Sequence, residues 1–126
     1  MKKGETLRGY QELTVTFASG SAVSNPFTAN NFALGNYWLP SAFTGLALGA
    51  QVAPAGGTYA TLVDHSNAYG TDVSNILPTA QLVAVLPGAF PGYWFAAGGI
   101  KLFSHDGSGS GIPQTSARVV NISLKS

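Results

Sequence analysis

Hydrophobic and polar residues alternate in several short stretches of this chain, and strict alternation is the pattern of a half-buried β-strand. In residues 11–18, the apolar side chains of Leu13, Val15 and Phe17 fall on one face, while threonines occupy the other. Residues 117–124 repeat the pattern near the end of the chain. No stretch keeps the spacing of an amphipathic helix for three turns without a Gly or Pro that interrupts it. The pattern therefore predicts an all-β domain.

The same reasoning predicts about eight strands, separated by turns that the 16 Gly and seven Pro residues supply. We expect them at residues 11–18, 32–39, 46–52, 58–63, 70–74, 80–86, 99–104 and 117–124. The proline and glycine residues at positions 87–92 predict a loop or a single helical turn between two of these strands. Eight short antiparallel strands in one small domain favour a jelly-roll-like β-sandwich. An up-and-down barrel is the alternative that strand spacing leaves open.

The chain length of 126 residues suits one domain with one core. Residues 1–9 are charged and contain glycine, which predicts a flexible N-terminal arm before a sandwich domain at residues 10–126. The chain has no cysteine, so the fold requires no disulfide and a cysteine-based zinc site is impossible. No apolar run is long enough to span a membrane, and no apolar segment of a signal peptide follows Lys2 and Lys3. We therefore expect no membrane partner and synthesis in the cytoplasm.

Charged residues make up only 9% of the chain, against about 25% in an ordinary soluble domain. A surface with so few charges favours burial against partners, including further copies of the chain in a dimer or trimer. The net charge of +1 is too small for a nucleic-acid-binding protein, because each phosphate contact requires a cation. Composition therefore favours a protein that works through contacts with other proteins.

Two histidine–aspartate doublets are the main candidates for chemistry: Asp64 with His65, and His105 with Asp106. A metal site that both doublets share is conceivable if their loops converge. Adjacent residues of a strand point to opposite faces, so the alternative of polar loop residues at strand ends is favoured. We expect Arg118 to form an ion pair with Asp64 or Asp106, with a partner contact as its alternative role. The sequence predicts no cofactor and no enzymatic activity.

The glycine–serine run at residues 106–111 has the letters of a phosphate loop and of a nucleophile elbow. A phosphate loop must open a helix, and a nucleophile elbow must join a strand to a helix. This run leads through Ile112 and Pro113 into a predicted strand. We therefore interpret it as a flexible loop between strands, whose tip is a candidate contact point.

Large aromatic and basic residues are the candidates for contact with a partner. They are Lys2, Lys3 and Arg8 in the arm, and Trp38, Tyr93 and Trp94 in the predicted sandwich. Consecutive aromatic residues must face both sides of any strand they occupy, so one of Tyr93 and Trp94 would be exposed. Exposed tyrosine and tryptophan are favoured anchors of protein interfaces, and they also stack on sugar rings.

Several short sequence elements occur in a recurring order from residue 32 onward. They are Leu39-Pro40, Phe43-Thr44-Gly45, Gly57-Thr58-Tyr59, Leu62-Val63-Asp64, the strand Ile100-Lys101-Leu102-Phe103-Ser104, and the ending Gln114 with Arg118-Val119-Val120. This order, which covers about three-quarters of the chain, resembles a group of small tailed-bacteriophage virion proteins. One departure is that Ala55 precedes Gly56 where such sequences often carry an aspartate.

The resemblance implies a β-sandwich or jelly-roll component of the capsid or the tail. The first hypothesis is a capsid decoration (cement) protein, located on the capsid surface of the virion and bound to the major capsid protein. The second is a tail- or fibre-associated module that binds a host surface glycan through Trp38, Tyr93 and Trp94. The third is a hydrolytic or metal-dependent enzyme that uses His65, His105 and the acidic residues near them. The resemblance assigns no functional residue to this chain.

Overall fold

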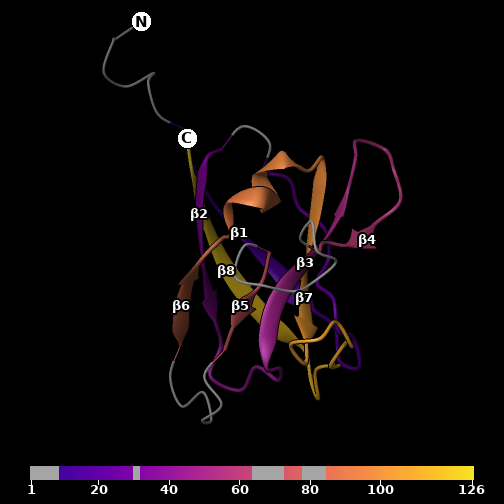
Figure 1. Ribbon diagram of the computed structural model, residues 1–126. Coiled ribbons are helices and arrows are strands. Elements are labelled where there is room, and N and C mark those ends of the chain that lie inside the picture. The colour runs from indigo at the N-terminus through magenta and orange to yellow at the C-terminus, as the bar shows by residue number, and fades with distance from the viewer. Residues whose placement is uncertain (1–8, 30–31, 64–72, 78–84) are drawn as a thin grey trace, which may run out of the picture.

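The computed structural model describes residues 9–29, 32–63, 73–77 and 85–126. These residues form eight β-strands and one 3-10 helix. The strands are β1 (Tyr10–Phe17), β2 (Leu34–Leu39), β3 (Ala47–Ala53), β4 (Ala60–Thr61), β5 (Asn75–Ile76), β6 (Leu86–Ala89), β7 (Gly99–His105) and β8 (Arg118–Lys125), and the helix is η1 (Gly92–Ala96). Figure 1 shows the strands in two layers, which confirms the predicted β-sandwich.

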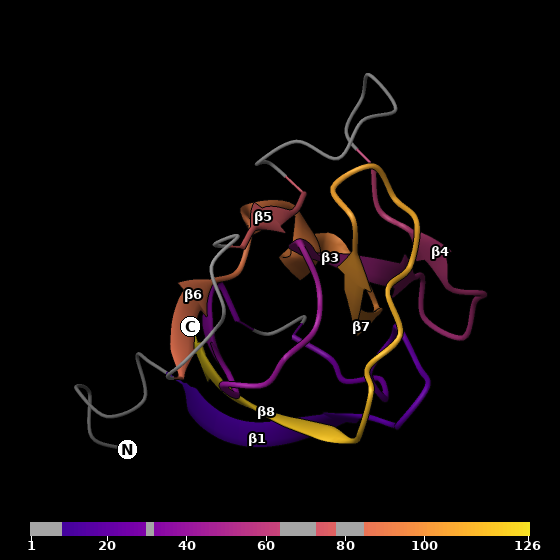
Figure 2. The same ribbon diagram turned by 90° about the horizontal axis from the view of Figure 1, so that it is seen from below.

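Sheet A has the strand order β1-β8-β2-β6, and sheet B has β3 at its centre. In sheet B, β7 pairs along one side of β3, and β4 and β5 pair along the other side. Every pairing is antiparallel. Seen from below in Figure 2, β1 and β8 run along one side of the molecule, and β3 and β4 lie on the other. The strands form two separate sheets, which excludes the up-and-down barrel, because its strands would close into a single sheet.

Residues 23–27 contribute to sheet B although they lie between two predicted strands. Val23 bridges Phe103, Phe27 bridges Ile100, and the backbone N–H of Ser24 donates to the carbonyl of Leu102 at 3.0 Å. This segment lies beside β7, so sheet B has the order 23–27, β7, β3, then β4 and β5. Together with sheet A, this order gives the two interleaved Greek keys of a jelly roll.

The alternation of apolar and polar residues in the first and last strands explains how sheet A folds. Register places Leu13 of β1 opposite Ile122 of β8, and Val15 opposite Val120, so the inward sets of both strands meet. Val15, Val120 and Ile122 are buried, while the threonines of β1 are exposed. The predicted faces of the first and last strands are therefore confirmed.

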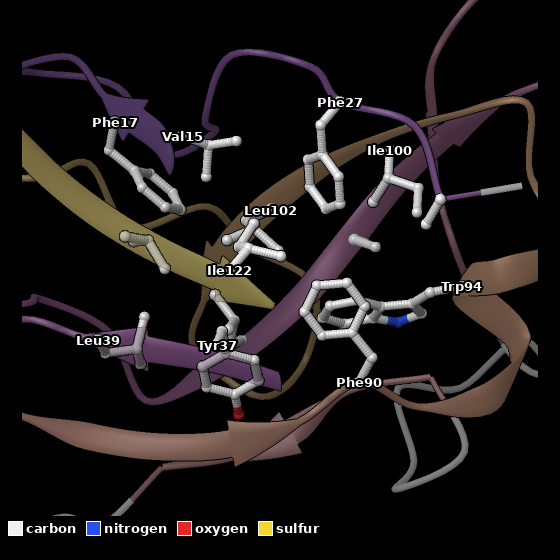
Figure 3. Close-up of a cluster of buried hydrophobic side chains, with 14 of the residues drawn as sticks. Val15, Phe17, Phe27, Tyr37, Leu39, Phe90, Trp94, Ile100, Leu102 and Ile122 are labelled. Atoms are coloured by element: carbon white, nitrogen blue, oxygen red, sulfur yellow. The ribbon is translucent and has the colours of Figure 1, made fainter. Parts of the chain in front are cut away.

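An aromatic cluster fills the space between the sheets, and Phe90 lies at its centre (Figure 3). Its ring centroid is 5.0 Å from that of Trp94, 5.9 Å from Phe27 and 6.1 Å from Tyr37. Aromatic side chains bury large areas, so this cluster supplies much of the hydrophobic stabilisation. It joins η1 to both sheets.

The prediction of a loop or helical turn at residues 87–92 is wrong for its first part. Residues 86–89 form β6, and Pro87 lies opposite Trp38 of β2. Proline is tolerated here because β6 is an edge strand, where an outward N–H is not needed. The helical turn begins at Gly92 instead. Most of the strand predicted at residues 80–86 lies outside the described residues.

Sheet B departs more from the predicted pattern. The strand predicted at residues 46–52 begins one residue too early, because Leu46 is 48% exposed and precedes β3, whereas Leu48 and Ala50 are buried. Gly49 is buried on the opposite face of the strand, because Ser74 and His105 cover it. The predicted strand at 58–63 is shortened to β4, and β5 begins after the predicted strand at 70–74.

Candidate functional site

The outer face of sheet A presents a set of side chains that point away from the core. They are Tyr10, Glu12, Thr14 and Thr16 of β1, Val119, Asn121, Ser123 and Lys125 of β8, Leu34, Asn36 and Trp38 of β2, and Pro87 and Ala89 of β6. We call this set the Trp38 face. Only Glu12 and Lys125 carry a charge among these side chains.

Trp38 lies in the middle of this face. Register places it opposite Asn121 of β8 on one side and Pro87 of β6 on the other. A shallow depression beside its half-buried ring is lined by Glu12, Thr14, Asn121 and Ser123, among others. An aromatic ring beside hydroxyl, amide and carboxylate groups can contact either protein or sugar.

Exposed apolar side chains surround this centre. Tyr10 is 64% exposed, Leu34 62% and Val119 53%. The hydroxyl of Tyr10 donates a hydrogen bond to Oε2 of Glu12 at 2.6 Å, which fixes both side chains on the face. The cores of protein interfaces are depleted of charged residues and enriched in aromatic ones, and the Trp38 face has this composition.

The structure corrects the prediction for Trp94. Its side chain is fully buried against Phe90, and its indole N–H donates to the carbonyl of Val73 at 2.9 Å. The physical reason is that residues 93–95 lie in η1, where successive side chains point in three directions instead of two. Trp94 is therefore a core residue, and Tyr93 is the exposed member at 62%.

Tyr93 lies away from the centre of the Trp38 face. It lines a separate apolar depression with Val52, Pro54 and Leu62, at the side of sheet B. The three aromatic residues proposed as contact residues therefore do not form one surface. Trp38 is the one that lies on a broad exposed face.

The predicted arm falls almost wholly outside the described residues, and so do its contact candidates Lys2, Lys3 and Arg8. Gly9 is described, and its backbone exchanges hydrogen bonds with Ser126. The N–H of Ser126 donates to the carbonyl of Gly9 at 3.0 Å, and the N–H of Gly9 donates to the Ser126 hydroxyl. The pairing of β1 with β8 therefore extends one residue into the range predicted as arm.

His105 is fully buried on the outer side of sheet B, and Ser74 lies against it. The backbone N–H of Gly107 donates to its Nδ1 at 3.0 Å, so in the neutral ring Nε2 carries the proton. Nε2 is 3.0 Å from the hydroxyl of Ser74 and donates to it. Burial lowers the pKa of His105, and the nearby charge of Asp106 opposes that shift. This geometry indicates a neutral histidine with a structural role.

Asp106 organises the loop that follows β7. Its Oδ1 accepts hydrogen bonds from the N–H and hydroxyl of Ser108, both at 2.8 Å, and from the N–H of Ser110 at 3.2 Å. These bonds, led by that from the Ser108 backbone, lower the pKa of the Asp106 carboxyl. Positive φ angles of 94° at Gly107 and 96° at Gly109 permit the turn. The carboxylate is thus engaged within its own loop.

The ion pair expected between Arg118 and Asp106 is absent. The Arg118 guanidinium donates instead to the hydroxyls of Ser116 at 2.7 Å and Thr115 at 3.1 Å.

Asp64 and His65, the other predicted doublet, lie outside the described residues. Across the described ranges, no group of three or more His, Cys, Asp or Glu side chains is placed to hold a metal ion. Within the same residues, no helix has the length and apolarity to cross a membrane.

Comparisons with known proteins support the fold. No family model matches the sequence, and a search of curated proteins gives no match. The chain is similar to the crystal structure of SPBc2 prophage-derived protein YomS, with a TM-score of 0.56 and 11% sequence identity. The likeness covers 95% of this chain and 96% of that chain. At this identity it shows a common sandwich fold over nearly the whole of both chains.

Proposed function

We propose that this chain is a structural protein of a bacteriophage virion, and that it acts as a capsid decoration (cement) protein. It binds the lattice of major capsid proteins at the capsid surface and works by contact rather than by catalysis. Two observations support a phage role: the order of sequence elements from residue 32 onward, and the fold that the chain has in common with a prophage-derived protein.

The proposal of a protein contact rests on the composition of the Trp38 face. It combines a central tryptophan, exposed apolar side chains and neutral polar groups, and it has two charges among its 13 side chains. Such a face buries against a partner at little desolvation cost, because few charges lose their hydration. A protein that binds only the assembled lattice stabilises the shell by mass action.

Co-sedimentation of the purified chain with capsids that lack it tests this proposal. The substitution Trp38→Ala removes the centre of the face, and we expect it to weaken capsid binding by on the order of tenfold or more. Tyr93→Ala is the control, because it removes an exposed aromatic residue from another surface. Equal binding of both variants and the wild type contradicts a lattice contact through the Trp38 face.

A second candidate is a tail- or fibre-associated module that binds a host surface glycan. The depression beside Trp38 favours it, because the ring lies next to the polar groups of Glu12, Thr14 and Asn121. Trp94 is buried, so a change in tryptophan fluorescence during titration with host polysaccharide would report on Trp38. A saturable change that Trp38→Phe abolishes supports the glycan role, and no change supports the capsid role.

A further inference from the structure

The two edges of sheet A differ in how they are protected. At the β6 edge, Pro87 has no N–H to offer, and the carbonyl of Ala89 accepts a hydrogen bond from the side chain of Asn75 at 2.8 Å. Both residues direct their backbone groups outward, because the alternate residues of β6 pair with β2. Proline is one of the devices that block an edge strand from further pairing, and a carbonyl that already accepts a hydrogen bond is less available to another strand. The β6 edge is therefore closed.

The β1 edge is closed at one end only. The N–H of Asn25 donates to the carbonyl of Thr16 at 3.0 Å, and Oδ1 of Asn25 accepts from the Thr16 N–H at 2.5 Å. Residues alternate along a strand, so Tyr10, Glu12 and Thr14 direct their N–H and C=O groups to the same side as Thr16. Among the described residues, these three have no backbone partner on that side. An open stretch with three outward-facing residues remains.

We propose that two copies of this chain associate by antiparallel pairing of their β1 strands, about a two-fold axis at Glu12. This register pairs all three open positions, with Tyr10 of each copy opposite Thr14 of the other. An aromatic residue opposite a β-branched one is a favourable cross-strand pair, and both side chains are exposed on the Trp38 face. The open edge of one copy is thus complementary to itself, as a two-fold interface requires.

The pairing joins two four-stranded sheets into one continuous sheet. Both Trp38 faces then lie on the same side, which doubles the surface available to a partner. Glu12 faces its own copy across the axis, and like charges directly opposite each other are destabilising. Glu12 therefore limits the strength of the dimer, in the way that charged residues restrain other edge strands. The inference concerns this edge alone and does not depend on the virion role.

Sedimentation equilibrium at protein concentrations up to roughly 1 mM tests the inference, because it detects dimers whose dissociation constant is as high as roughly 1 mM. We expect the mass to rise from 12.9 kDa toward twice that value. Thr14→Pro removes the outward N–H, as Pro87 does at the other edge, and should raise the dissociation constant by on the order of tenfold. Thr14→Val keeps the N–H and should leave the dissociation constant unchanged. Glu12→Gln removes the like-charge pair and should lower it several-fold.

Oxidative cross-linking gives a readout that does not depend on how Thr14→Pro folds. The chain has no cysteine, so Glu12→Cys places one thiol of each copy beside the other at the axis. Their Cα atoms would lie about 5.5 Å apart, within disulfide range. Asn121→Cys is the control, because β8 lies one strand farther from the axis. A wild type that stays monomeric, a folded Thr14→Pro that dimerises normally, or equal cross-linking of both cysteine variants overturns the inference.

Discussion

Asn75 of β5 donates a hydrogen bond from Nδ2 to the hydroxyl of Tyr37 of β2 at 2.6 Å, and this bond joins sheet B to sheet A. Tyr37 is only 2% exposed, so its hydroxyl depends on this partner. We expect Asn75→Ala to lower the free energy of unfolding by about 1 to 3 kcal/mol, because it leaves a buried hydroxyl unpaired. Urea unfolding of Asn75→Ala, Tyr37→Phe and the double variant measures the coupling. Additive losses would show that the bond contributes nothing.

Gly88 of β6 allows the ring of Tyr37, which lies opposite it on β2, to pack closely against β6. A Cβ atom at Gly88 would lie 2.3 Å from the Tyr37 hydroxyl oxygen, so Gly88→Ala must displace the ring. We expect a loss of about 1 to 3 kcal/mol in the free energy of unfolding. Gly92→Ala is the control, since no atom lies within 4 Å of the added group. Similar stability of the two variants would contradict this account of β6.

The buried His105 should make stability depend on pH. Its pKa is lowered in the folded state, whereas an unfolded histidine has a pKa near about 6.5. Below that pH the unfolded chain takes up a proton that the folded chain does not, so the free energy of unfolding falls as pH falls from about 7 toward the lowered pKa. Urea unfolding between about pH 5 and pH 8 should show a smaller slope for His105→Gln than for the wild type. Identical slopes would show that His105 does not titrate differently on folding.

The two tryptophans should separate in a quenching experiment. Trp38 is half-buried on the surface, whereas Trp94 is fully buried and hydrogen-bonded to Val73. Trp38→Phe should remove most of the fluorescence that acrylamide quenches and change the free energy of unfolding by about 1 kcal/mol or less. Trp94→Phe should leave that quenching in place and reduce stability by about 2 to 3 kcal/mol. The reverse pattern would mean that the two tryptophans have been assigned to the wrong environments.

The sequence was sufficient to predict the first and last strands, which pair in sheet A, and insufficient to predict the strands of sheet B. Strict alternation predicted the inward faces of β1 and β8, because each has one buried and one exposed side. Strand β3 is buried on both faces, so alternation could not locate its start, and the predicted strand began at Leu46, which is exposed and lies before β3. Residues 23–27 pair with β7 through isolated bridges and carry no strand pattern.

The candidate site was predictable only in part, because it depends on which strands are neighbours. The sequence identified Trp38 as a candidate contact residue, and the outward direction of Asn121 and Ser123 follows from alternation in β8. Nothing in the sequence places β8 between β1 and β2, which brings these residues beside Trp38. Trp94 was misjudged because consecutive aromatic residues in a 3-10 helix follow a period of three rather than two.

Quantitative mass spectrometry of purified phage particles, produced from the genome that encodes this chain, tests the central claim most directly. The quantity to measure is the number of copies of this chain for each copy of the major capsid protein. We predict a ratio of roughly one, or a simple fraction fixed by the symmetry of the shell. A few copies per particle would instead indicate the tail or a single vertex. Absence of the chain from purified particles would contradict a role in the virion.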